Sequence, residues 1–251
     1  MNGISNFETV SGVLKKYHGR DEKICIPEGV TEIGESAFSE CQFLKEITIA
    51  KSVKRIGKGA FGMCENLERV FLSECLTEIG EAAFFKCGKL SEITLPQGLL
   101  KIGDHSFLGC SGLKEITLPE GLEALGDYAF GGCRGLGDEK GFVIVKNVLF
   151  NYFGEEKNIT VPQTVKKIGK EAFSWNSGLN SVQFAEGVTE IGDYAFLHCS
   201  GLSELHIPIG LQSIGKGAFL GCKNLKSITL PKTVESIGNG AFYDCPAEVK
   251  R

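Results

Sequence analysis

One stretch of sequence decides the fold of this 251-residue chain: Leu44-Lys45-Glu46-Ile47-Thr48-Ile49-Ala50-Lys51-Ser52-Val53-Lys54-Arg55-Ile56-Gly57-Lys58-Gly59-Ala60-Phe61-Gly62-Met63-Cys64-Glu65-Asn66. Its Ile-Gly pair, once replaced by Leu-Gly, returns every 23 residues except for a single step of 43, and a phenylalanine stands four residues after each glycine. A fixed period of this length predicts a solenoid, in which each turn of chain buries its apolar side against the next. The marking glycines are Gly34, Gly57, Gly80, Gly103, Gly126, Gly169, Gly192, Gly215 and Gly238.

Within this repeat the residue types predict where the chain is extended and where it turns. The piece 47–49 alternates apolar and polar β-branched residues, which indicates a short strand. A proline follows the strand in six repeats and is expected to end it. Val53 and Ile56 are expected to point inward and Gly57 to supply a bend. Ala60 and Phe61 are expected to fill the far side, on a turn or a single helical turn.

The repeat resembles a known family. Its pattern, L-x-x-I-x-I-P-x-x-V-x-x-I-G-x-x-A-F-x-x-C, is similar to that of BspA-like leucine-rich repeats, also called the treponemal type, over roughly residues 24–251 in nine copies. The resemblance implies a right-handed α/β leucine-rich-repeat solenoid, mostly strands and turns. It would have a parallel β-sheet on the concave face and short helical turns or loops opposite. Known relatives are mostly surface or secreted proteins of bacteria and some protozoa, several of them implicated in adhesion.

The 43-residue step contains a second pattern that also opens the chain. Residues 142–154 hold two β-rich runs around Lys146-Asn147, which predicts a hairpin, and residues 7–19 match them at an offset of 135. The chain is therefore predicted to be two tandem units, each a hairpin followed by repeats. The expected parts are an N-terminal capping hairpin (1–23), repeats 1–5 (24–133), an internal hairpin insertion (134–158) and repeats 6–9 with a C-terminal cap (159–251).

The end of the chain departs from the repeat. Glu248 stands where the pattern expects a leucine, so the last strand is predicted to be missing. A polar residue at this position suits a C-terminal cap, because the last coil of a solenoid must present a polar outer face. The chain is therefore expected to be complete at this end.

Ten cysteines suggest a disulfide framework until they are placed on the repeat. Eight share one register, and Asn176 takes the same place in the sixth repeat. Parallel side chains stacked in this way are poorly oriented for disulfides, so a ladder of buried free thiols is predicted. Cys25 and Cys75 lie off the ladder. Its members are Cys41, Cys64, Cys87, Cys110, Cys133, Cys199, Cys222 and Cys245.

Composition and motifs exclude several functions. A net charge of −4 and a pI near 5.7 argue against nucleic-acid binding. No stretch reaches the roughly 18–20 apolar residues of a membrane helix. No metal or nucleotide motif is present, so no metal and no cofactor are expected. His198 adjoins Cys199, but a ladder cysteine is unsuited to act as a nucleophile. The chain is therefore predicted not to be an enzyme and to have no catalytic residues.

Candidate binding residues are those that break the pattern on the solvent side of the sheet. At the solvent-facing position that Thr48 occupies in the second repeat, five of the nine repeats hold threonine. Arg69 and Phe71 bring a cation and an aromatic ring to that face, and both types are enriched in binding hot spots. Gln183 and His206 form a weaker pair in adjacent repeats. For both pairs, drift of the repeat or packing against a hairpin is the competing interpretation. An acidic row at residues 46, 92 and 115 could attract a basic partner, but is interpreted first as solvated.

The predicted function is that of a non-catalytic module, expected to be monomeric, which binds a protein through the sheet face. The resemblance implies adhesion or recognition of a host or bacterial surface protein. Carbohydrate binding is an alternative, although Phe71 is alone on the sheet and Trp175 lies in a turn. A cytosolic scaffold is another. The location stays open, because the family suggests the cell surface whereas no signal peptide is visible and the cysteines look reduced.

Overall fold

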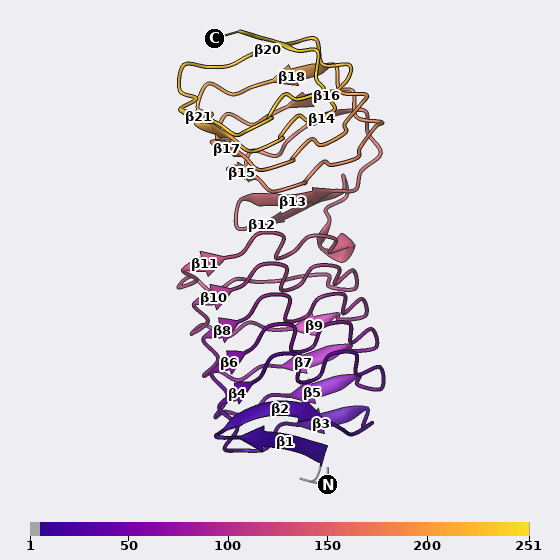
Figure 1. Ribbon diagram of the computed structural model, residues 1–251, viewed down its shortest axis with the longest axis vertical. Helices are drawn as coiled ribbons and strands as arrows, with labels where there is room; N and C mark the ends of the chain where they lie inside the picture. Colours follow the sequence, from indigo (N-terminus) through magenta and orange to yellow (C-terminus); the bar gives the residue numbers. More distant parts are fainter. Residues whose placement is uncertain (1–5, 251) are drawn as a thin grey trace. The chain divides into compact units, whose positions relative to one another are not determined.

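The computed structural model describes residues 6–250, which divide into two compact units, Met1–Leu136 and Gly137–Arg251. Each unit is a stack of similar coils, and the strands of successive coils lie one above another (Figure 1). The predicted solenoid is therefore confirmed. The described residues contain no α-helix, and Arg134–Leu136 forms a 3-10 turn.

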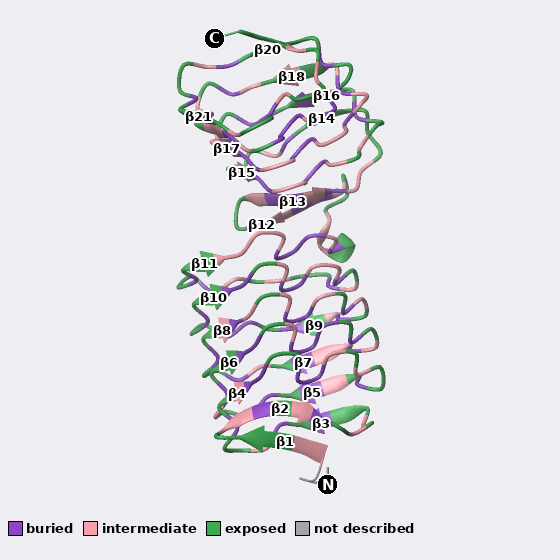
Figure 2. Cartoon of the chain, viewed as in Figure 1, coloured by how far each residue is buried: buried purple, intermediate pink, exposed green. Residues whose placement is uncertain are grey.

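The predicted strand forms in every repeat except the fifth, where residues 113–119 have no regular secondary structure. Neighbouring strands pair in parallel at the 23-residue spacing, on what is called here the sheet face. Its outward residues are exposed or half-buried, whereas the central residue of most strands points into the core (Figure 2). In the first unit it comprises β3 (Lys23–Cys25), β5 (Glu46–Thr48), β7 (Arg69–Phe71) and β9 (Glu92–Ile93). In the second unit it comprises β14 (Asn158–Thr160), β16 (Ser181–Gln183), β18 (Glu204–His206), β20 (Ser227–Thr229) and β22 (Glu248–Lys250).

A second parallel ladder, which the sequence analysis did not predict, runs through the residue pair before each marker glycine. Its strands are only two residues long, too short to show alternation in the sequence. In the first unit they are β4 (Glu32–Ile33), β6 (Arg55–Ile56), β8 (Glu78–Ile79), β10 (Lys101–Ile102) and β11 (Ala124–Leu125). In the second they are β15 (Lys167–Ile168), β17 (Glu190–Ile191), β19 (Ser213–Ile214) and β21 (Ser236–Ile237).

Both predicted hairpins are present and start this second ladder. β1 (Phe7–Val10) and β2 (Val13–Tyr17) pair antiparallel, as do β12 (Phe142–Val145) and β13 (Val148–Tyr152). Lys146 and Asn147 have φ of 47° and 65°, as a two-residue type I′ hairpin turn requires. β2 then pairs with β4, and β13 pairs with β15. That the hairpins act as caps stays a prediction.

The far side of each coil is a chain of turns rather than a helical turn. In the third repeat Ala82 and Lys86 both have left-handed backbone, with φ of 52° and 56°. A right-handed helix cannot pass through residues in that conformation, which is why none forms here.

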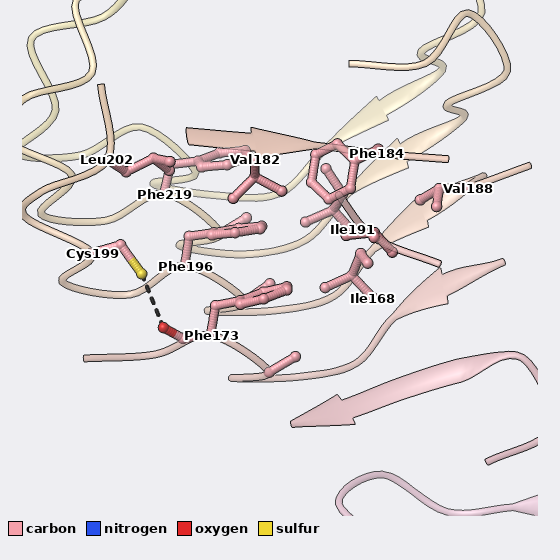
Figure 3. Packing of buried hydrophobic residues seen from close by; sticks show 14 of the residues in the cluster. Ile168, Phe173, Val182, Phe184, Val188, Ile191, Phe196, Cys199, Leu202 and Phe219 are labelled. Carbon is pink, nitrogen blue, oxygen red and sulfur yellow. Dashed lines mark hydrogen bonds between the residues drawn. The ribbon is translucent and has the colours of Figure 1, made fainter. Parts of the chain in front are cut away.

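The core of each coil is built on stacked phenylalanine rings. From Phe38 to Phe130 the centroids of successive rings are 5.0–5.3 Å apart. Tyr17 and Tyr152 of the hairpins extend the two stacks, at 5.2 and 5.6 Å from the first phenylalanine of each unit. Figure 3 shows the second unit's stack, with valine and isoleucine side chains beside the rings. The repeat therefore gives every coil the same apolar filling.

The marker glycines are required by close packing. A Cβ added at Gly103 would lie 2.6 Å from the backbone nitrogen of Glu81 in the preceding coil. Gly103 is not among the residues with positive φ. The contact with the neighbouring coil, rather than a special bend, therefore excludes a side chain.

The prediction that the last strand is missing was wrong. β22 pairs with β20 in parallel, Glu248 opposite Ser227, two residues earlier than the repeat spacing requires. Only Pro246 and Ala247 separate Cys245 from β22, whereas a longer connection separates Cys222 from β20. Glu248 therefore begins the strand, although the repeat pattern placed it at the leucine position of the core.

Candidate binding surfaces on the sheet face

Arg69 lies on β7 within a row of alternating charges. Its guanidinium donates two hydrogen bonds to Oε2 of Glu46, at 2.9 Å from Nε and 2.6 Å from Nη2. Lys23 Nζ lies 3.5 Å from the same oxygen. These bonds, first that from Arg69, lower the pKa of the Glu46 carboxyl. Glu46 therefore holds the Arg69 guanidinium in place, and the charge of Arg69 is already paired within the chain.

Phe71, two residues further along β7, points to the same face and is 48% exposed. It lines a groove of about 290 Å³ that extends over β9. Three carboxylates line the groove as well, those of Glu74, Glu92 and Glu115. No ion pair within 4.0 Å involves them among residues 6–250. An aromatic ring beside carboxylates can receive a cationic side chain, through its π face and by ion pairing.

Gln183 and His206 are brought together as predicted, because they are opposite each other in the ladder between β16 and β18. His206 also lines a second groove, of about 550 Å³, which lies between β18 and β20. Arg69 and Phe71 belong to the first unit, whereas Gln183 and His206 belong to the second. The two pairs are therefore treated as separate candidate sites.

Sequence reasoning missed Ile209, which lines the second groove and is 75% exposed. A signal for it existed. The position after the strand-ending proline is polar in every other repeat, so an isoleucine there breaks the pattern at an exposed site. The polar counterparts are Glu28, Lys51, Glu74, Gln97, Glu120, Gln163, Glu186 and Lys232.

The cysteines form the predicted ladder of free thiols, of which Cys41 and Cys245 at the ends are only half-buried. Cys199 Sγ donates a hydrogen bond of 2.9 Å to the carbonyl of Phe173 in the preceding coil (Figure 3). Burial raises the pKa of this thiol to about 12. The neighbouring His198 instead packs against Trp175, with ring centroids 4.3 Å apart and ring planes inclined at 42°. Cys199 and His198 are thus engaged in different contacts, one in the core and one at the surface.

Trp175 itself is 69% exposed, on the turn side of the coil rather than on the sheet face. Within the part of the chain that the structure describes, no cluster of three or more potential ligands could hold a metal ion. The same residues include no helix with the length and apolar character needed to cross a membrane.

Comparison with known proteins agrees with this architecture. The model of the BspA type leucine-rich repeat region matches residues 17–137 and 143–249, in six copies. A T. pallidum leucine-rich repeat protein is 26% identical with a TM-score of 0.54, covering 89% of this chain and 90% of its own. A leucine-rich repeat protein from Eubacterium ventriosum is 22% identical with a TM-score of 0.63, covering 97% and 79%. The pneumococcal vaccine antigen PcpA is 24% identical with a TM-score of 0.56, covering 95% and 75%.

No curated protein sequence matches the chain. The family model, however, covers well over half of it, and the solved structures share its stacked coils. The chain therefore belongs to the BspA-type leucine-rich repeat family, whose repeats form scaffolds for protein interaction.

Proposed function

We propose that this chain is a non-catalytic module that binds a protein partner through the sheet face of its first unit. The observation that carries the proposal is the exposed ring of Phe71 in a groove with three carboxylates. The partner would place a lysine or arginine side chain against the ring and between the carboxylates, where both cation–π attraction and ion pairing favour it. Arg69 acts as a positioning residue, because it neutralises Glu46 beside the groove.

The proposal is tested by recovering partners from a cell extract with wild-type protein and with Phe71→Ala. Loss of a central aromatic anchor from an interface weakens binding by about tenfold or more, so the recovered partner should fall accordingly. Arg69→Ala should have a smaller effect, because it removes a neighbour of the groove and leaves Phe71 in place.

Phe43→Ala is the matched control, because Phe43 is 51% exposed but does not line the groove. It should leave recovery unchanged. Equal recovery by wild type and Phe71→Ala, in protein shown to be folded by circular dichroism, would remove this groove from consideration.

Recognition of a host or bacterial surface protein is the finer proposal. It is supported by membership of the BspA-type leucine-rich repeat family. Carbohydrate binding has less support, because exposed Trp175 packs against His198 and lies away from the sheet face.

A further inference from the structure

The ladder on the sheet face of the second unit is interrupted once. β14, β16 and β18 form one sheet, and β20 and β22 form another. β18 and β20 come from consecutive repeats, but among residues 6–250 no ladder pair joins them. We call the space between these two strands the seam.

The interruption leaves main-chain groups without bonds that their counterparts in several other repeats make. Ile49 N–H donates to the Phe71 carbonyl at 2.8 Å, and Val161 N–H donates to that of Gln183 at 2.9 Å. The corresponding bond from Ile207 to Thr229 is missing from the described part of the chain. Lys226 N–H likewise lacks the bond to the preceding coil that its counterparts make. The seam therefore presents two strand edges with unmet donors and acceptors, which is the condition for adding another strand.

The coil is open on this side only. On the second ladder β17, β19 and β21 pair without interruption through the same repeats. The groove of about 550 Å³ lies at this opening and is lined by residues of both β18 and β20. The continuous ladder holds the two edges in place and makes the opening a preformed site.

Side chains along the seam differ from those of closed repeats. Leu205 and Ile207 are only partly buried, whereas their counterparts Ile47 and Ile49 are 0% and 4% exposed. Ile209 adds an exposed apolar side chain at the rim. Covering these three side chains would remove apolar surface from water, which favours an apolar occupant.

Glu204 decides the charge of that occupant. It lines the seam on β18, and no ion pair of the described residues includes it. Its counterpart Glu46 is bound by Arg69 from the next strand of the closed ladder. A strand added beside β18 with a basic residue at the matching position would supply the same pair to Glu204.

We propose that an extended segment of another protein, with the pattern basic–apolar–any–apolar, adds to the seam as a β-strand. Its main chain bonds to the edges of β18 and β20. Its apolar residues cover Leu205 and Ile207, and its basic residue pairs with Glu204. The inference rests on the proposed protein-binding function and assigns it a second site with a defined class of partner.

The chain itself supplies a probe of this chemistry. A synthetic peptide copying residues 67–73, Leu-Glu-Arg-Val-Phe-Leu-Ser, has the required pattern and pairs with Glu46 in the native ladder. Amide hydrogen exchange of the full chain is measured by NMR with and without this peptide. In the free protein the Ile207 amide should exchange at least about tenfold faster than that of Ile49, because it lacks a hydrogen bond. The peptide should slow Ile207 exchange by a similar factor.

Four controls define the site. The same peptide methylated on its strand amides keeps its side chains but loses its donors, and should not protect Ile207. Glu204→Lys should weaken binding of the fluorescent peptide, measured by anisotropy, whereas Glu235→Lys, at an exposed site outside the seam, should not. Ile209→Glu should also weaken it.

An Ile207 amide protected as well as that of Ile49 in free protein would overturn the proposal, as would equal binding of the methylated peptide. The Phe71→Ala protein should still bind the probe. Because this assay uses neither the Phe71 groove nor the recovered partner, its failure leaves the test of the proposed function unaffected.

Discussion

At the scale of single residues, the ladder cysteines act as small hydrogen-bond donors inside the core. Cys87, Cys110 and Cys133 each donate to the carbonyl of a phenylalanine in the preceding coil, at 3.1 Å. Asn176 fits the same register because an amide can also donate. The sequence register identified this ladder, but the acceptor became known only from the packing of neighbouring coils.

The buried thiols predict a loss of stability at high pH. The pKa of Cys199 is raised by burial to about 12, above the roughly 8.5 of an unfolded cysteine. The stabilisation is complete below about pH 8.5 and is lost as pH rises toward 12. The free energy of unfolding should fall by about 1.4 kcal/mol per pH unit for each such thiol in this window.

Urea unfolding at pH 8 and pH 10 measures this loss. The Cys199→Ala protein should show a smaller decrease between the two values than wild type does. An identical decrease in both proteins would contradict the role of this thiol.

At the scale of the repeat element, the marker glycine sets how closely two coils approach. Gly103→Ala should destabilise the protein by more than about 1 kcal/mol, because the new methyl group would meet backbone on the adjacent coil. Chemical denaturation measures the change.

Gly121→Ala is the matched control, since a Cβ there has no atom within 4 Å. This variant should be neutral or slightly stabilised. If both variants lost the same stability, the close approach of the coils would not explain the repeated glycine.

At the scale of the whole molecule, each compact unit contains its own hairpin and its own ladders. The apolar cluster around Phe173 and Phe196 draws its buried members from residues 142–241, all in the second unit. A solenoid needs a special first coil, because its first internal coil would otherwise expose an apolar face and an unpaired edge.

A fragment of residues 137–251 should therefore fold alone, with a β-type circular dichroism spectrum and cooperative thermal unfolding. A fragment of residues 159–251, which lacks β12 and β13, should unfold at a lower temperature or fail to fold. Equal stability of the two fragments would contradict a capping role for this hairpin.

The sequence by itself determined the solenoid, the strand of every repeat except the fifth, the two hairpins and the thiol ladder. These follow from short-range periodicity, because every coil repeats the same local choices. Only the tertiary structure revealed the second ladder, the early pairing of Glu248 and the seam at Ile207. Those features depend on which main-chain groups meet between particular coils. A pattern that is common to all repeats does not specify where one coil departs from the others. For the same reason Phe71 could be singled out from the sequence, whereas its groove with Glu74 and Glu115 could not.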